Sequence, residues 1–110
     1  MAHNKEVSPT VQLGNDAIDS TKLFAVCQRY HVQELSLFGS AARGEMKPGS
    51  DLDLLVTFLP GAAIDLVDYA SLMLDLAELM GCKVDLVSKR GLKPSIKDSV
   101  LRDARLLYAA

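Results

Sequence analysis

Apolar side chains recur along the chain with two periods, one typical of strands and one typical of helices. Three segments show the strand pattern: residues 32–38, 51–58 and 82–88. Three others show helical spacing: residues 20–30, 64–80 and 94–108. The order is helix, strand, strand, helix, strand, helix. We therefore predict an α/β (α+β) fold, with a small mixed sheet of three or more strands and helices packed mainly on one side.

Two of these segments show most clearly which side chains should face the core. In residues 51–58 the even positions are apolar and the odd positions begin with two aspartates. One face of this strand should therefore be buried, and the other should start polar. In residues 64–80 the apolar positions at helical spacing should form the buried stripe, and Gly81 should end the helix. These positions are Leu66, Val67, Ala70, Leu74, Ala77 and Leu79 or Met80.

The first fifteen residues are polar and show no sustained period. We therefore expect residues 1–15 to be a flexible N-terminal arm, which a partner can order. Residues 16–110 then make up one domain, because a chain of 110 residues has room for a single core of moderate size.

Composition and charge narrow the class of protein. A hydrophobic share of 49% and a charged share of 24% are ordinary for a soluble globular domain. The net charge of −2 argues against a general nucleic-acid binder, so no direct nucleic-acid binding is expected. The apolar runs are too short for a membrane span, and no signal-peptide pattern opens the chain. Cys27 and Cys82 lie far apart and lack metal-ligand spacing, so we expect buried, reduced thiols in a cytoplasmic protein.

The residues after the first predicted strand suit a polyphosphate. Gly39 lets the backbone approach a ligand closely. Ser40 adds a hydroxyl group at the start of what reads as one helical turn, residues 41–44, where free backbone amides favour an anion. Arg43 follows within that turn, so its guanidinium can reach the same anion as a charge-assisted donor. This pattern indicates a phosphate cradle.

Asp51 and Asp53 open the second predicted strand. Because they are two positions apart, both carboxylates leave the same face, with Cβ atoms roughly 6–7 Å apart. Carboxylates at that spacing can bind one or two Mg²⁺ ions that also hold phosphate oxygens, and the metal removes the cost of burying like charges. A solvated Asp-x-Asp pair at a strand edge is the plainer reading of these two residues alone. The Gly-Ser turn ten residues earlier favours the metal site.

Gly39-Ser40, ten intervening residues and Asp51-Leu52-Asp53 match the signature of the DNA polymerase β-like nucleotidyltransferase superfamily. The longer stretch GSAARGEMKPGSDLDLLV, with a later VDLV, resembles the smallest members of that superfamily. Those are the MNT antitoxins of the MNT/HEPN toxin–antitoxin systems of bacteria and archaea. The similarity extends from about residue 35 to the C-terminus and implies a nucleotidyltransferase-like fold.

The resemblance also implies a role for each residue of the site. Gly39 and Ser40 hold the triphosphate, Arg43 contacts a phosphate, and Ser50 offers its backbone or its hydroxyl group. The third carboxylate of the family falls on Asp85, which helps to bind the catalytic metal and orients or deprotonates the attacking hydroxyl group. Without the resemblance, Asp85 reads equally well as an ordinary surface acid. The catalytic and metal-binding residues that the resemblance implies are Asp51, Asp53 and Asp85.

By the same resemblance, the chain is a Mg²⁺-dependent antitoxin enzyme that transfers AMP from ATP to a tyrosine hydroxyl group of a cognate HEPN ribonuclease toxin and silences it. One alternative is a non-catalytic antitoxin that acts by stoichiometric binding. The basic residues within 89–105 would dock the toxin, although a solvated helix face is the plainer explanation of their charge. Another alternative is transfer to a small molecule. It is less favoured, because the chain ends soon after the third strand and one helix and offers few walls for an acceptor pocket.

Overall fold

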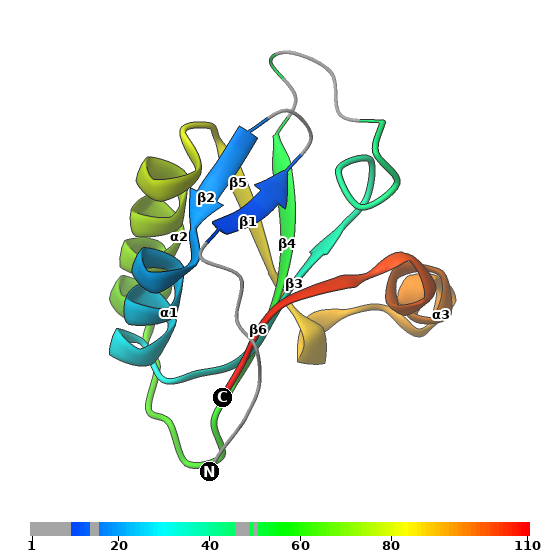
Figure 1. The fold of residues 1–110 in the computed structure, drawn as a ribbon. Helices are drawn as coiled ribbons and strands as arrows, with labels where there is room; N and C mark the ends of the chain where they lie inside the picture. The colour runs from blue at the N-terminus through cyan, green and yellow to red at the C-terminus, as the bar shows by residue number, and fades with distance from the viewer. Residues whose placement is uncertain (1–9, 14–15, 46–48, 50) are drawn as a thin grey trace, which may run out of the picture.

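The computed structural model describes residues 10–13, 16–45, 49 and 51–110 (Figure 1). In chain order the elements are β1 (Thr10–Leu13), β2 (Asp16–Asp19), α1 (Ser20–Arg29), β3 (Val32–Phe38), β4 (Leu52–Phe58), α2 (Leu66–Met80), β5 (Val84–Ser88), the 3-10 helix η1 (Lys89–Gly91), α3 (Pro94–Asp103) and β6 (Arg105–Ala109). Four strands form one sheet in the order β5-β4-β3-β6, in which β4 and β5 are parallel and the other neighbours are antiparallel. The predicted mixed α/β fold is confirmed.

The two faces of this sheet are covered unequally. α1 and α2 lie side by side against one face, whereas α3 lies on the other side of the sheet (Figure 1). The face under α1 and α2 carries the core, which includes the even positions of β4, as the alternation predicted. The face that carries Asp53 therefore points away from α1 and α2. The even positions are Leu52, Leu54, Val56 and the partly buried Phe58.

Local signals explain where α1 and α2 begin and end. Asp19 caps α1 by accepting a 2.9 Å hydrogen bond from the backbone N–H of Thr21. Asp65 and Asp68 form a reciprocal capping box at the start of α2. Gly81 ends α2 with a φ of 72°, a left-handed conformation that glycine adopts without strain.

The buried stripe of α2 differs from the prediction. Leu66, Val67 and Leu74 were expected in the core, but they are 83%, 72% and 66% exposed, so that part of the prediction was wrong. α2 is apolar around most of its circumference, and the helical period alone therefore does not select the buried side. Contacts with α1 and β5 select it instead. The fully buried side chains of α2 are Leu72, Leu76 and Met80.

The helix predicted over residues 94–108 ends earlier than expected. α3 stops at Asp103, and β6 runs antiparallel along the edge of β3. Leu107 and Tyr108 are buried, as expected, but they belong to a strand. A short apolar run is compatible with either period, and the unpaired backbone groups at the edge of β3 favour the strand.

A hairpin near the N-terminus was not predicted. β1 pairs antiparallel with β2, with Thr10 opposite Asp19. β1 comes before residue 15 in the chain and β2 after it, and residue 15 is where the sequence pattern placed the end of the flexible arm. Residues 1–9 and 14–15 lie outside the described part of the chain, so flexibility of the arm stays a prediction.

Neither cysteine forms a disulfide. Cys27 is fully buried, and its burial raises the pKa of its thiol to about 12, which keeps the thiol protonated and unreactive. Cys82 is partly buried at the start of the segment that leads into β5. No helix in the described ranges is both long enough and apolar enough to cross a membrane.

Candidate active site

Gly39 and Asp53 meet at one end of the sheet. Gly39 directly follows β3, and Asp53 is the second residue of β4, where it pairs with Phe38. A Cβ atom placed on Gly39 would lie 2.5 Å from Oδ2 of Asp53, and the φ of Gly39 is 71°. Both the contact and the backbone conformation therefore require glycine here. The antiparallel pairing of β3 with β4 therefore places the Gly-Ser turn beside the carboxylate of Asp53, near the start of β4.

The parallel pairing of β4 with β5 places a second carboxylate beside Asp53. In its register Asp53 is directly opposite Asp85. Residues opposite each other on neighbouring strands project from the same face, about 5 Å apart in the direction of hydrogen bonding. Asp51 lies two positions before Asp53 and belongs to the same alternating set. All three predicted carboxylates therefore lie at the starts of β4 and β5, on the face turned away from α1 and α2.

The electrostatic environment of Asp53 shows that the three carboxylates interact. The pKa of Asp53 is raised, first because the side chain is partly buried and then because of the negative charges of Asp85 and Asp51. Asp51 and Asp85 are exposed to solvent. Ionised Asp53 is therefore disfavoured by its own surroundings, and a bound cation would offset that cost.

The residues at this place fit Mg²⁺ by the chemistry of their donors. They offer carboxylate oxygens alone, and Mg²⁺ prefers oxygen ligands, usually one or two carboxylates completed by water and phosphate oxygens. Within the described ranges, no three carboxylate, imidazole or thiol groups converge closely enough to hold a metal ion by themselves. The arrangement is therefore an open one, in which a nucleotide phosphate would have to complete the coordination of the metal.

Residues 39–45 form a compact turn that differs from the predicted turn of helix. The backbone N–H of Arg43 donates to the carbonyl of Gly39 at 3.3 Å, and that of Glu45 donates to the carbonyl of Ser40 at 2.8 Å. The segment contains hydrogen-bonded turns but no helix. The argument for an anion at a helix N-terminus therefore does not apply. Phosphate binding at this turn would rest on the backbone amides and on the partly buried Ser40.

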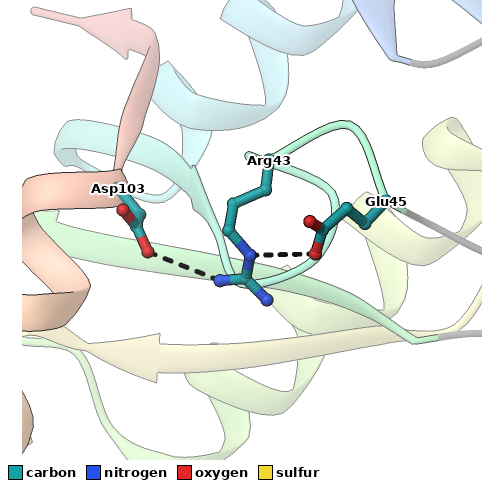
Figure 2. Close-up of polar contacts among 3 residues, drawn as sticks. All are labelled: Arg43, Glu45 and Asp103. Atoms are coloured by element: carbon teal, nitrogen blue, oxygen red, sulfur yellow. Dashed lines mark hydrogen bonds and ion pairs between the residues drawn. The ribbon is translucent and has the colours of Figure 1, made fainter.

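Arg43 contacts two carboxylates (Figure 2). Its Nε donates to Oε1 of Glu45 at 3.1 Å, and its Nη1 donates to Oδ2 of Asp103 at 3.4 Å. Asp103 is the last residue of α3, so this second contact joins the Gly-Ser turn to a helix sixty positions further along the chain. A guanidinium has five N–H groups, and the remaining ones can still reach a phosphate.

Substitutions at Arg43 and Asp103 should separate these two roles of the guanidinium. Both ion pairs are about half exposed, so we expect Arg43→Ala and Asp103→Asn each to leave the free energy of unfolding nearly unchanged. We expect Arg43→Ala alone to raise the KM for the nucleotide about tenfold, because it removes a charge-assisted donor. Urea denaturation and nucleotide titrations of the initial rate measure both effects. Equal KM values for the two variants would mean that Arg43 acts only by holding the turn against α3.

Two further observations limit the extent of the site. Ser50, the remaining residue predicted to bind nucleotide, lies outside the described residues. A cavity of about 600 Å³ lies at the far ends of β4 and β5, among Phe58, Leu59, Tyr69 and Arg90. Because the aspartates lie at the opposite ends of the same strands, this cavity is separate from them.

Asp103 is the residue of this region that sequence reasoning missed. In the sequence it reads as one of several charged positions on a polar helix, and no spacing connects it with Arg43. Only the position of α3 relative to the turn brings the two side chains together.

Comparisons with known proteins identify the family and the fold of this chain. A model of the nucleotidyltransferase domain family matches residues 21–107. Protein adenylyltransferase MntA of Thermococcus cleftensis is 42% identical over 80 residues, which cover 69% of this chain and 75% of that protein. A solved structure described as a "putative minimal nucleotidyltransferase" superposes with a TM-score of 0.67 at 44% identity, covering 78% of this chain and 86% of that one.

A more distant structure shows the same fold. It is the tri-AMPylated HEPN toxin of Shewanella oneidensis in complex with its MNT antitoxin. The match has a TM-score of 0.59 at 22% identity and covers 83% of this chain and 70% of the other. The family match covers most of the chain, and the chain belongs to the nucleotidyltransferase domain family.

Proposed function

We propose that this chain is a Mg²⁺-dependent adenylyltransferase antitoxin, which transfers AMP from ATP to a tyrosine hydroxyl group of a cognate HEPN ribonuclease toxin and thereby silences it. The observation that carries the proposal is the placement of Asp53, which contacts the Gly39 turn on one side and pairs with Asp85 on the other. The relative from Thermococcus cleftensis that bears the name protein adenylyltransferase supports the choice of AMP and of a protein acceptor. The AMPylated toxin in the more distant complex supports the choice of partner.

The residues of the site have separate roles in this reaction. The acceptor oxygen attacks the α-phosphorus of ATP, the bond from that phosphorus to the bridging oxygen breaks, and pyrophosphate leaves. Gly39 and Ser40 bind the triphosphate, and Ser50 remains a proposed further contact. Asp85 would orient the hydroxyl group and accept its proton, and its exposed position opposite Asp53 supports this role. Bound Mg²⁺ would be held by Asp51, Asp53 and Asp85. It would supply positive charge for the entering and leaving oxygens.

This function also sets the expected location of the protein. ATP and the ribonuclease toxin are both found in the cytoplasm, so we propose a cytoplasmic protein. The lack of a disulfide at Cys27 and Cys82 is consistent with a reducing compartment. We expect no membrane contact and no direct nucleic-acid binding.

Intact-mass analysis of the co-purified HEPN partner tests the proposal. After incubation with this chain, ATP and Mg²⁺, the partner should gain one or more AMP-sized increments, and fragment spectra should place them on tyrosine. Chelation of the metal with EDTA should abolish the increments, and addition of Mg²⁺ in excess should restore them. A partner whose mass is unchanged under all conditions would contradict the proposal.

A second function is favoured by one observation. α3 has no buried residue, and residues 89–105, which include it, carry six basic and two acidic side chains, which suits a chain that silences its toxin by stoichiometric binding. The two functions differ in their need for ATP. Silencing of the ribonuclease at equimolar concentration without ATP, and by a variant that lacks all three aspartates, would favour binding over transfer.

A further inference from the structure

The cavity at the ends of β4 and β5 that lie away from the aspartates has no role in the proposed reaction. Its volume is about 600 Å³, which falls within the range of about 300–1,000 Å³ that is usual for small-molecule sites. β4 and β5 are parallel and are joined through α2, so their carboxyl ends meet at this cavity. The carboxyl ends of parallel strands are a common place for ligands in α/β sheets.

The half-buried side chains of the cavity include two aromatic rings. Phe58 ends β4 and Tyr69 lies in the first turn of α2, and their ring centroids are 6.3 Å apart. The hydroxyl group of Tyr69 donates to the carbonyl of Leu86 at 2.6 Å, which fixes its ring against β5. Ile64, also half-buried, lines the cavity just before α2. These three side chains suit the apolar body of a ligand, because aromatic and aliphatic groups form most of the lining of small-molecule sites.

The charge of the cavity has one sign. Among the described residues that line it, Arg90 is the one charged side chain, and it is exposed. Within the described ranges Arg90 forms no ion pair, whereas the neighbouring Lys89 is 3.9 Å from the carboxylate of Glu34. Ser88 is opposite Val56 in the parallel register, so it shares a face with Phe58 and adds a hydroxyl group to the cavity. A guanidinium without a carboxylate beside it, in a chain of net charge −2, favours an anion.

We propose that this cavity binds a small organic anion with a single negative charge and a flat apolar body, such as an aromatic carboxylate. The ring system of the ligand packs against Phe58 and Tyr69, and its carboxylate accepts hydrogen bonds from the guanidinium of Arg90 and the hydroxyl group of Ser88. A nucleoside triphosphate fits this cavity poorly, because it carries several negative charges and the described lining offers a single cation. The site is therefore distinct from the one that binds ATP in the proposed reaction.

Calorimetric titration with two probes tests the site. 2-Naphthoate is an aromatic carboxylate, and 2-naphthamide has the same ring system without the charge. Arg90→Gln removes the cation of the cavity, and Ala62→Trp places an indole in it, because the half-buried Ala62 is part of the lining. Arg105→Gln is the matched control, because Arg105 is also exposed and without an ion pair in the described ranges, but it lies in β6 and does not line the cavity. Thermal unfolding checks that each variant is folded.

We expect the wild type to bind 2-naphthoate more tightly than 2-naphthamide. Arg90→Gln should weaken the binding of 2-naphthoate at least about tenfold, because it removes a charge-assisted donor, and should leave the affinity for 2-naphthamide unchanged. Ala62→Trp should weaken the binding of both probes, since the indole takes the space of their rings. Arg105→Gln should match the wild type with both probes, and an excess of ATP should not displace 2-naphthoate.

Three results would overturn the proposed site. One is the absence of 2-naphthoate binding to the wild type up to the solubility limit of the probe. Another is an equal affinity of Arg90→Gln and the wild type for 2-naphthoate, and the third is displacement of 2-naphthoate by ATP, which would indicate a nucleotide site instead. None of these measurements uses AMP transfer, so the result is independent of whether the proposed function holds.

Discussion

Replacement of Asp53 by asparagine is expected to reduce AMP transfer at least about 100-fold while the chain stays folded. Asparagine has nearly the same shape, but it lacks the negative charge that would hold a divalent cation beside the triphosphate, and such electrostatic contributions are commonly worth factors of this size. Initial rates of AMP transfer to the partner measure the effect. Glu78→Gln removes one carboxylate from the exposed part of α2 and serves as the matched control, with an expected rate equal to that of the wild type.

Asp53→Asn should also change how the stability of the chain depends on pH. The pKa of Asp53 is raised in the folded chain. Ionisation of this side chain therefore lowers the free energy of unfolding as the pH rises through that pKa. Asp53→Asn should therefore be as stable as the wild type or more stable at neutral pH. The difference should disappear as the pH falls below the ordinary range of an aspartate. Urea denaturation across this pH range measures the difference. Full transfer activity in Asp53→Asn, or a loss of stability confined to neutral pH, would contradict the placement of this residue.

Replacement of Gly39 by alanine is expected to lower both the stability of the chain and the rate of AMP transfer. The added Cβ would lie 2.5 Å from Oδ2 of Asp53, so either the turn or the carboxylate must move. Alanine must also adopt a φ of 71°, which costs roughly 1–2 kcal/mol. We expect a loss of stability of about that size, together with a fall in transfer of at least about tenfold, because small misplacements of reacting groups have large effects on rate.

Gly61→Ala is the matched control for this substitution. Gly61 has a φ of 81°, and no atom lies within 4 Å of the position of an added Cβ. It should therefore lose similar stability through the backbone but keep its transfer activity. Urea denaturation and initial rates on both variants isolate the contact with Asp53. If Gly39→Ala and Gly61→Ala had the same activity, the close approach of Gly39 to Asp53 would have no role in the reaction.

Much of the fold was predictable because it depends on neighbours in the chain. The alternation in β4 and the turn residues that follow β3 are local features, and so are the caps of α1 and α2. The closeness of Gly39 to Asp53 also follows from local order. Gly39 directly follows β3, Asp53 is the second residue of β4, and consecutive antiparallel strands place such residues side by side.

Three features were decided by the tertiary structure. α2 is apolar on too many sides for its period to select a buried face, so packing against α1 and β5 left Leu66 and Val67 exposed. Residues 105–109 fit either a helix or a strand, and the edge of β3 made them a strand. The contact between Arg43 and Asp103 depends on where α3 comes to rest.

The carboxylates show the same division within the candidate site. The shared face of Asp51 and Asp53 could be predicted from the sequence, because alternation along a strand is a property of the local backbone. It offered Asp85 only through a resemblance, because α2 and its flanking loops separate β4 from β5 along the chain. The parallel register of those two strands, which places Asp85 opposite Asp53, is a long-range pairing. It is set by how α2 packs on the sheet, and no local pattern encodes it.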